Sequence, residues 1–475
     1  MMDKKFYITT AIPYVNDAPH IGHALEFVQA DTVARYHRLL GEDVTLLSGA
    51  DENALKNVRA AEQAGIETQT FVDKNAKLFQ NLAEKLGVQF DIFQKGSDQE
   101  HHYPSSQKLW QLCQENGDIY KKSYTGLYCV GCEAFYTPEE LNDKGECFEH
   151  PGKKLEELKE ENYFFKLSKY QDQLINLIES DQYKIIPEFR KKEILSFLKS
   201  GLQDISISRT NERAKNWGVP VPNDPNQRIY VWFDALNIYQ SGIGFGWDEE
   251  KYKKWWPADL HVIGKGIIRF HAVYWPAFLL SAKLALPKKL FVHEYLTVDG
   301  QKMSKTIGNV FDPLPLIEKY GADSVRYYLL ARVSPFADGN FSAEKFKEVY
   351  NADLANGLGN LVSRVAKLCE QHNIKASTPS NVWCTDLEKF MGEFKFNEAI
   401  GVIWQLIHEA DKKINEDKPW ELSTEQVKPI LEDLVNIIQA IAYNLKPFLP
   451  ETAEKITKQF SGQIKSGPPL FPRLQ

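Results

Sequence analysis

The sequence has 475 residues, of which 43% are hydrophobic, 12% aromatic and 25% charged, and it carries a net charge of −7. This composition is typical of a folded globular protein and excludes a disordered chain and a collagen-like fibre. The length predicts about three domains. The longest uncharged apolar run, 272–282, is shorter than the roughly 20 residues of a membrane helix. The net negative charge gives no general indication of nucleic-acid binding.

The chain begins with a predicted strand, Phe6–Tyr14, that follows two lysines directly. Because it lacks the apolar core of a signal peptide, we expect a cytoplasmic protein without a membrane segment. A helical pattern follows Pro19 and ends near Gly41, and a second strand is predicted at Val44–Leu47. Strands that alternate with helices predict an α/β fold with a parallel sheet.

Polar turns then interrupt this alternation, and a cysteine-rich stretch follows, which predicts an insertion. Strand-like runs resume at 228–233, 261–264 and 291–298. From Tyr350 onward, leucines and valines recur at helical spacing and predict only helices. Further helices are expected at 387–415, 425–446 and 450–460.

The first candidate site is the motif His20-Ile21-Gly22-His23, where the first strand leads into the first helix. The N-terminus of a helix offers free backbone N–H groups and a positive dipole end that can bind phosphate, and Gly22 allows close approach. Taken alone, the motif fits a capped surface helix with two incidental histidines better than it fits a phosphate site.

The second candidate site is Lys302-Met303-Ser304-Lys305-Thr306, which lies between glycines. Two lysines three residues apart on a mobile loop suit a clamp on a polyphosphate, although a solvated basic turn has the same composition. The two motifs together, about 280 residues apart, are much more specific than either alone.

The third candidate site is a metal site. Cys129 and Cys132 form one pair and Cys147 and His150 a second pair, with fourteen residues between them. Three thiolates and one imidazole make a closed tetrahedral set without an open position for catalysis. The spacing therefore predicts one structural Zn²⁺ ion.

With these motifs the sequence resembles the class I aminoacyl-tRNA synthetases, and within them the methionyl-tRNA synthetases. The resemblance rests on the stretches TAIPYVNDAPHIGHALEFVQAD, YVWFDAL, HVIGKGIIRFHAVYWPA, LTVDGQKMSKTIGNV and PLFPR. It implies that L-methionine is activated with ATP and Mg²⁺ and then transferred to tRNA(Met), and that the minimal chain is a monomer. Catalysis would then depend on positioning and charge stabilisation rather than on a side-chain nucleophile.

The resemblance also implies a domain order. We expect a Rossmann-like catalytic domain in two halves, 1–115 and 228–290, interrupted at 116–227 by a connective insertion with the zinc knuckle. A stem-contact region with the lysine motif would occupy 291–350, and an α-helical anticodon-binding bundle 351–475.

The site residues that the resemblance implies fall into three groups beside the zinc ligands. The catalytic and ATP-binding group is His20, His23, Lys302 and Lys305, with Glu26 and Gly264 added for ATP. The methionine-binding group is Ile12, Tyr14, Asp51, Trp232, Ala235, Leu236, Tyr239, Ile267, His271 and Trp275. The anticodon group is Asn360, Arg364 and Trp420.

The sequence departs from the family pattern near the chemistry. Asn53 and Ala54 stand where the family has histidine and glycine, Gly266 replaces an aspartate, Glu294 replaces a glycine and Thr306 a serine. An alternative is therefore a divergent paralogue that keeps the fold and tRNA binding but has weak or altered amino-acid activation. A nucleotidyltransferase acting on a small substrate is a third reading, but it would not need the anticodon group.

Overall fold

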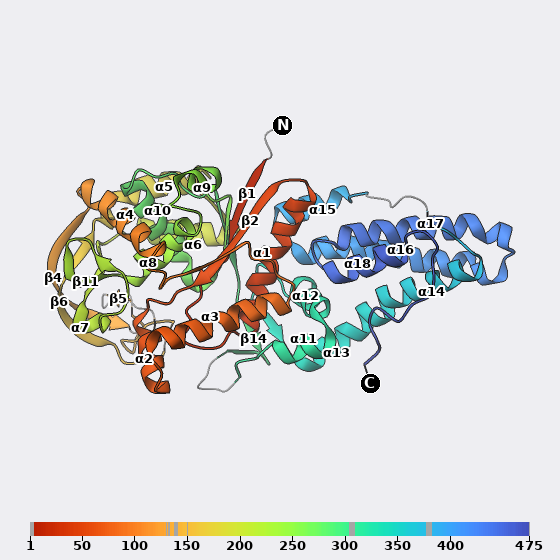
Figure 1. Ribbon diagram of the computed structural model, residues 1–475, viewed down its shortest axis with the longest axis horizontal. Helices are drawn as coiled ribbons and strands as arrows, with labels where there is room; N and C mark the ends of the chain where they lie inside the picture. The colour runs from red at the N-terminus through yellow and green to blue at the C-terminus, as the bar shows by residue number, and fades with distance from the viewer. Residues whose placement is uncertain are drawn as a thin grey trace. The chain divides into compact units, whose positions relative to one another are not determined.

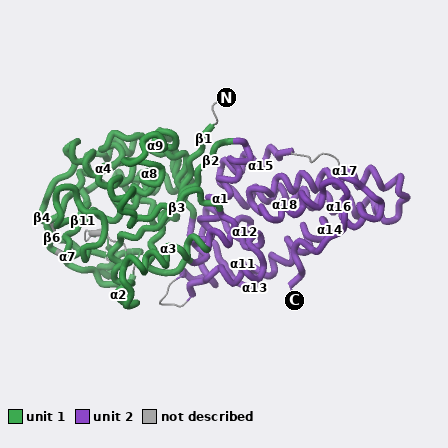
Figure 2. Tube along the Cα trace, in the orientation of Figure 1, with its two compact units in different colours: residues 1–19, 42–81, 89–293 green, residues 20–41, 82–88, 294–475 purple. Residues whose placement is uncertain are grey.

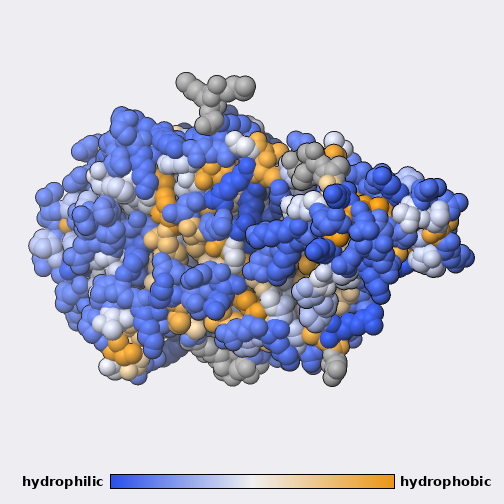
Figure 3. Space-filling view, turned by 45° about the vertical axis from the view of Figure 1, so that its right-hand side comes forward, coloured by the Kyte–Doolittle hydropathy of each residue, from blue (hydrophilic) through white to orange (hydrophobic). Residues whose placement is uncertain are grey.

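The computed structural model describes residues 4–129, 131, 134–136, 141–149, 151–303, 309–376 and 382–474 (Figure 1). The chain forms two compact units (Figure 2). Unit 1 comprises residues 1–19, 42–81 and 89–293, and unit 2 comprises residues 20–41, 82–88 and 294–475. None of the described helices is long and apolar enough to cross a membrane, and the face drawn in Figure 3 is mostly hydrophilic.

Unit 1 is built on a six-stranded sheet whose strand pairs are all parallel. Its order is β3 (Ile92–Lys95), β2 (Asp43–Ala50), β1 (Lys5–Thr9), β12 (Leu260–Gly264), β13 (Lys289–His293) and β7 (Lys184–Ile186). The central strands are apolar runs buried over most of their length, as is usual for a parallel sheet covered on both faces. The expected α/β class is confirmed.

Two antiparallel sheets interrupt this pattern between β3 and β12. One has the order β5 (Ala134–Tyr136), β4 (Ile119–Cys129), β6 (Glu156–Phe165) and β8 (Ile205–Ser206), and the other has β10 (Pro220–Val221), β11 (Asp224–Ile229) and β9 (Ser208–Thr210). The remaining helices of unit 1 are α2 (Leu55–Ala64), α4 (His102–Glu115), α5 (Gln171–Glu179), α6 (Glu188–Lys199), α7 (Asn211–Ala214), α8 (Val231–Ser241), α9 (Glu249–Trp255) and α10 (Trp275–Ser281). Helix α3 (Thr68–Lys85) runs from unit 1 into unit 2.

Unit 2 is mainly helical. A small sheet of β15 (Gln301–Lys302), β14 (Leu296–Val298) and β16 (Gly339–Phe341) precedes most of its helices. The helices are α1 (Ile21–Leu39), α11 (Leu314–Tyr320), α12 (Ala322–Ala331), α13 (Ala343–Val349), α14 (Gly359–Gln371), α15 (Thr385–Gly392), α16 (Phe396–Asp417), α17 (Thr424–Leu445) and α18 (Pro450–Gln459), with a π-helical segment at Tyr350–Leu358.

Four predicted elements were wrong in detail. The first strand, expected at Phe6–Tyr14, is observed at Lys5–Thr9. The run 228–233 is not one strand, because β11 ends at Ile229 and α8 begins at Val231. All eleven residues of α8 are buried, and a helix that is buried on every face lacks the exposed polar stripe that would separate it from a buried strand. The strand expected at 291–298 is divided between β13 and β14, and the helix expected at 387–415 is broken at Phe394, whose φ is 57°.

A buried ion pair joins the first helix of unit 2 to later helices. Arg326 on α12 and Asp31 on α1 are both fully buried, and their Nη1 and Oδ2 atoms are 2.8 Å apart. Arg35 donates to the same carboxylate over 2.7 Å. The Arg326 guanidinium also donates to the carbonyl oxygens of Phe448, 2.8 Å, and Pro447, 3.1 Å. The position of α1 is therefore tied to α12 and to the end of α17.

Replacement of Asp31 by asparagine should lower the free energy of unfolding by about 3–5 kcal/mol, because it leaves a buried guanidinium without its counter-charge. Urea unfolding followed by circular dichroism measures the change. The control is Glu454→Gln, which removes an exposed pair with Lys458 and should leave the free energy of unfolding nearly unchanged. Equal losses in the two variants would contradict the assignment.

Candidate active site

The N-terminus of α1 is closed by two histidines that cap each other's backbone. His20 is the N-cap residue, and its Nδ1 accepts a hydrogen bond from the Gly22 N–H over 3.1 Å. The Nδ1 of His23 accepts from the His20 N–H, also over 3.1 Å, and the two rings lie 4.0 Å apart. Since both Nδ1 atoms are acceptors, each neutral ring carries its proton on Nε2. The first turn of α1 holds no acidic side chain, so this end of the helix favours an anion.

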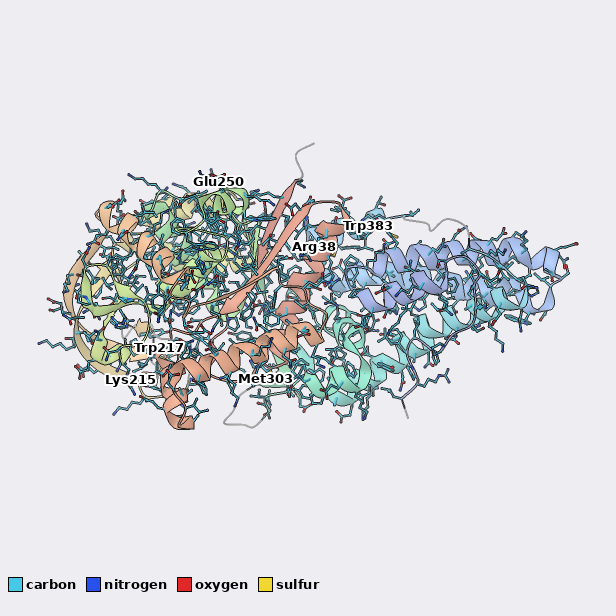
Figure 4. All side chains as sticks on the ribbon, viewed as in Figure 1. Arg38, Lys215, Trp217, Glu250, Met303 and Trp383 are labelled. Atoms are coloured by element: carbon cyan, nitrogen blue, oxygen red, sulfur yellow. The ribbon has the colours of Figure 1, made fainter. Side chains whose placement is uncertain are left out.

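The segments on both sides of the lysine loop reach this same helix end within unit 2. The Ile21 N–H donates to the Phe311 carbonyl over 3.0 Å. A Cβ atom added at Gly22 would lie 2.9 Å from Cε1 of His20 and 3.4 Å from Cε of Met303. Met303 is labelled in Figure 4. Gly22 is thus required by its neighbours, because any side chain would displace the His20 ring.

The two predicted lysines differ in what the structure describes. Lys302 is exposed, in β15, and its Nζ lies 5.3 Å from the centre of the Tyr295 ring. Lys305 lies outside the described residues, as do Ser304 and Thr306. Glu26 lies one turn beyond His23 on α1 and is 8% exposed.

The residues predicted for methionine lie together in unit 1. Trp232 on α8 stacks on Phe270 with ring centres 3.6 Å apart, and it meets Tyr14 edge-on at 6.0 Å. Tyr239 lies 6.3 Å from Trp275. Trp232, Tyr239 and Trp275 belong to one buried core cluster together with Leu236. The partly buried side chains of Ile12, Tyr14, Ile267 and Phe270 pack against it. Ala235, on α8, is buried as well.

Asp51 follows the last residue of β2 and is 2% exposed. It forms an isolated parallel bridge with Tyr14, and its N–H donates to the Pro13 carbonyl over 2.9 Å. A carboxylate is thereby held next to the segment that carries two of the predicted methionine-binding residues, at the carboxyl end of a parallel strand, where α/β folds bind ligands.

A hydrogen-bonded chain fixes the proton of His271. Its Nδ1 donates to the Ile267 carbonyl over 3.0 Å, and the Tyr239 hydroxyl then donates to Nε2 over 2.7 Å. Burial lowers the pKa of His271 to about 4. The imidazole is therefore neutral at physiological pH, and its orientation is set by two bonds.

His261 and Phe270 belong to this cluster but were not predicted. The His261 ring centre is 4.4 Å from that of Tyr239, and its Nδ1 lies 2.6 Å from the Thr9 hydroxyl. Burial lowers its pKa well below 6.5. A single histidine inside the apolar strand HVIG was the available signal, but the sequence alone does not tell a buried core histidine from one beside a site.

Two of the residues that depart from the family pattern, Gly266 and Glu294, lie just after strands of the parallel sheet. Gly266 lies in the short turn Lys265–Ile267 that follows Gly264 at the end of β12. Glu294 follows β13 and is 5% exposed.

The predicted metal ligands are described only in part. Cys129 ends β4, and both Cys129 and Cys147 are buried, at 2% and 1% exposure. Cys132 and His150 lie outside the described residues. Within the described part of the chain no group of three metal-binding side chains occurs, and this set of four is not complete there.

The predicted anticodon residues come together in unit 2. The Arg364 guanidinium on α14 lies 5.9 Å from the Trp420 ring centre, and it donates to Asn415 Oδ1 over 3.1 Å. Trp420 is 53% exposed. Asn360 lies one helical turn before Arg364. The arrangement presents an aromatic face, a guanidinium and an amide to solvent or a ligand.

Known proteins match this chain over nearly its whole length. The family model for tRNA synthetases class I (M) matches residues 6–366. A methionine–tRNA ligase of Thermotoga maritima is 42% identical over 97% of this chain and 76% of its own length. One from Brucella suis biovar 1 is 41% identical over 96% of this chain and 92% of its own.

A solved structure agrees with this result. Mycobacterium tuberculosis methionyl-tRNA synthetase in complex with methionyl-adenylate has a TM-score of 0.91 and 36% identity, covering 99% of this chain and 100% of that one. The chain therefore belongs to the methionyl-tRNA synthetase family of class I tRNA synthetases.

Proposed function

We propose that the protein is a methionine–tRNA ligase that activates L-methionine with ATP and transfers it to tRNA(Met). The observation that carries this proposal is the joining of the two signature motifs: the His20–His23 cap contacts the flanks of the lysine loop through Ile21 and Gly22. The family match with methionine–tRNA ligases supports the same activity. The alternative of a paralogue with altered activation is not favoured.

The end of α1 would bind the phosphates of ATP. The helix dipole and the Nε2–H groups of His20 and His23 would stabilise the charge that develops as the methionine carboxylate attacks the α-phosphate. Lys302 and Lys305 would neutralise the leaving pyrophosphate, with Glu26 and Gly264 holding the nucleoside. Mg²⁺ bound with ATP would supply further charge neutralisation.

The aromatic cluster of unit 1 would bind methionine. A thioether makes almost no hydrogen bonds, so selection depends on close packing against rings such as Trp232, Tyr239 and Trp275. Asp51 would pair with the substrate ammonium. His271 in its neutral form would keep the Tyr239 hydroxyl fixed against the cluster.

Asn360, Arg364 and the exposed Trp420 would bind the anticodon of tRNA(Met). An exposed indole can stack an unpaired base, while the guanidinium and amide can bond base edges. The proximity of Arg364 to Trp420 supports this role.

A structural Zn²⁺ ion would be held by Cys129, Cys132, Cys147 and His150. The donor set suits zinc, and the burial of Cys129 and Cys147 within a polar, largely exposed segment supports it. The proposed domain order follows the same logic: catalytic halves at 1–115 and 228–290, the zinc-bearing insertion at 116–227, the stem-contact region at 291–350 and the anticodon bundle at 351–475. We further propose a cytoplasmic monomer.

The proposal is tested by ATP–pyrophosphate exchange with a panel of amino acids, followed by charging of tRNA(Met) and of a transcript with a changed anticodon. We expect exchange with methionine alone and charging of the unchanged tRNA only. Exchange driven by another amino acid, or none from folded protein, would refute it.

Replacement of His20 separates its capping role from its catalytic role. Asparagine keeps an N-cap acceptor but lacks the Nε2–H donor, so His20→Asn should lower kcat for exchange by about 10²–10³-fold with little change in Tm. His20→Ala should show the same kcat loss and a further loss of about 1 kcal/mol in stability. An active His20→Asn variant would show that the ring serves only as a cap.

The low pKa of His271 predicts a pH-dependent stability. In the unfolded chain His271 has a pKa near 6.5 and is protonated below that pH, whereas in the folded protein its pKa is about 4. Stability is thus greatest above pH 6.5 and falls as pH falls toward 4, by on the order of 2 kcal/mol between pH 7 and pH 5. Urea unfolding of wild type and His271→Gln at both pH values measures this, and the variant should lose less. Parallel losses would argue against a buried neutral imidazole.

A further inference from the structure

Asn53 lies in the segment after β2 and is 8% exposed. Its Nδ2 group donates two hydrogen bonds, to Asp234 Oδ2 over 2.6 Å and to the Gly96 carbonyl over 2.7 Å. Both acceptors require an N–H, so the orientation of the amide is determined by its partners.

Asp234 also accepts hydrogen bonds from two side chains of one other segment, helix α4. Its Oδ1 accepts from His102 Nε2 over 2.7 Å and from the Ser106 hydroxyl over 2.9 Å, both on α4. His102 is fully buried and Asp234 is 1% exposed. A carboxylate this deeply buried is stable only when its oxygens are hydrogen-bonded. Among the described residues, Asn53 provides the hydrogen bond to Oδ2.

The Asn53–Asp234 bond joins two segments that carry residues proposed to bind methionine. Asp234 lies on α8 between Trp232 and Ala235, which belong to the apolar wall. Asn53 lies two residues after Asp51, whose carbonyl accepts from Asn57 Nδ2 over 2.8 Å. The intervening Glu52 carbonyl accepts from the Trp217 indole over 2.8 Å, and Trp217 is labelled in Figure 4. Three consecutive residues are thus anchored, and the side chain of Asn53 connects them to α8.

We propose that Asn53 is a positioning residue for methionine: its amide sets the distance between the Asp51 carboxylate and the Trp232 wall of α8. This inference rests on the proposed function. Asn53 is one of the positions where the sequence departs from the family pattern of histidine. A neutral imidazole has one N–H and can serve one of the two acceptors, whereas the amide serves both. Asparagine in place of the family's histidine therefore keeps both segments bonded, and it does not indicate that the methionine site has been lost.

The experiment compares Asn53→Ala, Asn53→His and the control Asn162→Ala. Asn162 is a fully buried amide of unit 1, on β6, that donates to Glu160 and has no bond to α8. Each variant is measured for KM of methionine and of ATP in exchange, for Tm, and for methionine binding by quenching of intrinsic tryptophan fluorescence, which needs no turnover.

We expect Asn53→Ala to raise KM and Kd for methionine about tenfold, because a buried acceptor is left unsatisfied and the two walls separate. KM for ATP should stay within about twofold. Asn53→His, with one donor, should lie between wild type and Asn53→Ala. Asn162→Ala should lower Tm without changing either KM.

Unchanged methionine affinity in Asn53→Ala would overturn the inference, and so would equal increases in both KM values, because these indicate a general structural role. If Asn53→Ala does not fold, Asn53→His decides the question by the same criterion. A wild-type protein without methionine-dependent exchange would refute the proposed function itself, whereas an active wild type with an unaffected Asn53→Ala refutes this inference alone.

Discussion

The Asp31–Arg326 pair is the contact on which the arrangement of unit 2 depends most. A guanidinium buried among helices has to find acceptors for its donors, and Arg326 finds them in one carboxylate and in the carbonyl oxygens that follow α17. Asp31 is on the helix whose other end carries His20 and His23. The pair therefore does more than offset its own desolvation. It places the end of α1 that carries His20 and His23 relative to α12 and to the segment that follows α17.

In unit 1, by contrast, buried imidazoles are neutral rather than paired with an opposite charge. Its central cluster holds two buried histidines, His261 and His271, whose burial lowers their pKa values and keeps them uncharged. The buried Asp234 carboxylate of the same unit accepts hydrogen bonds from Asn53, His102 and Ser106. An uncharged, hydrogen-bonded aromatic cluster suits the recognition of a substrate whose distinguishing group is an apolar thioether. The charged and dipolar groups of the candidate site lie instead at the ends of elements, at the N-terminus of α1 and at Asp51 after β2.

The sequence allowed much of the fold to be predicted, because alternating apolar strands and helices and the leucine spacing after Tyr350 are local signals. It failed at 230–233, because α8 begins there and is buried on every face. The motif residues could be recognised from their pattern. The bonds of Asn53 to Asp234 and of His102 to Asp234 could not, because the partners are 181 and 132 residues apart and no periodicity relates them. From the sequence alone, Asn53 suggests the loss of a family histidine. In the structure its amide donates to two buried acceptors.

Gly22 has a consequence for how this protein can change over time. Its backbone does not need glycine's conformational freedom. The space is needed because the His20 ring lies where a Cβ atom would be, with Met303 beside it. A replacement at any of these three positions alters the room available to the other two. Their tolerated substitutions are therefore not independent, and an evolutionary path that alters one must pass through compensating changes in its neighbours or through an inactive intermediate.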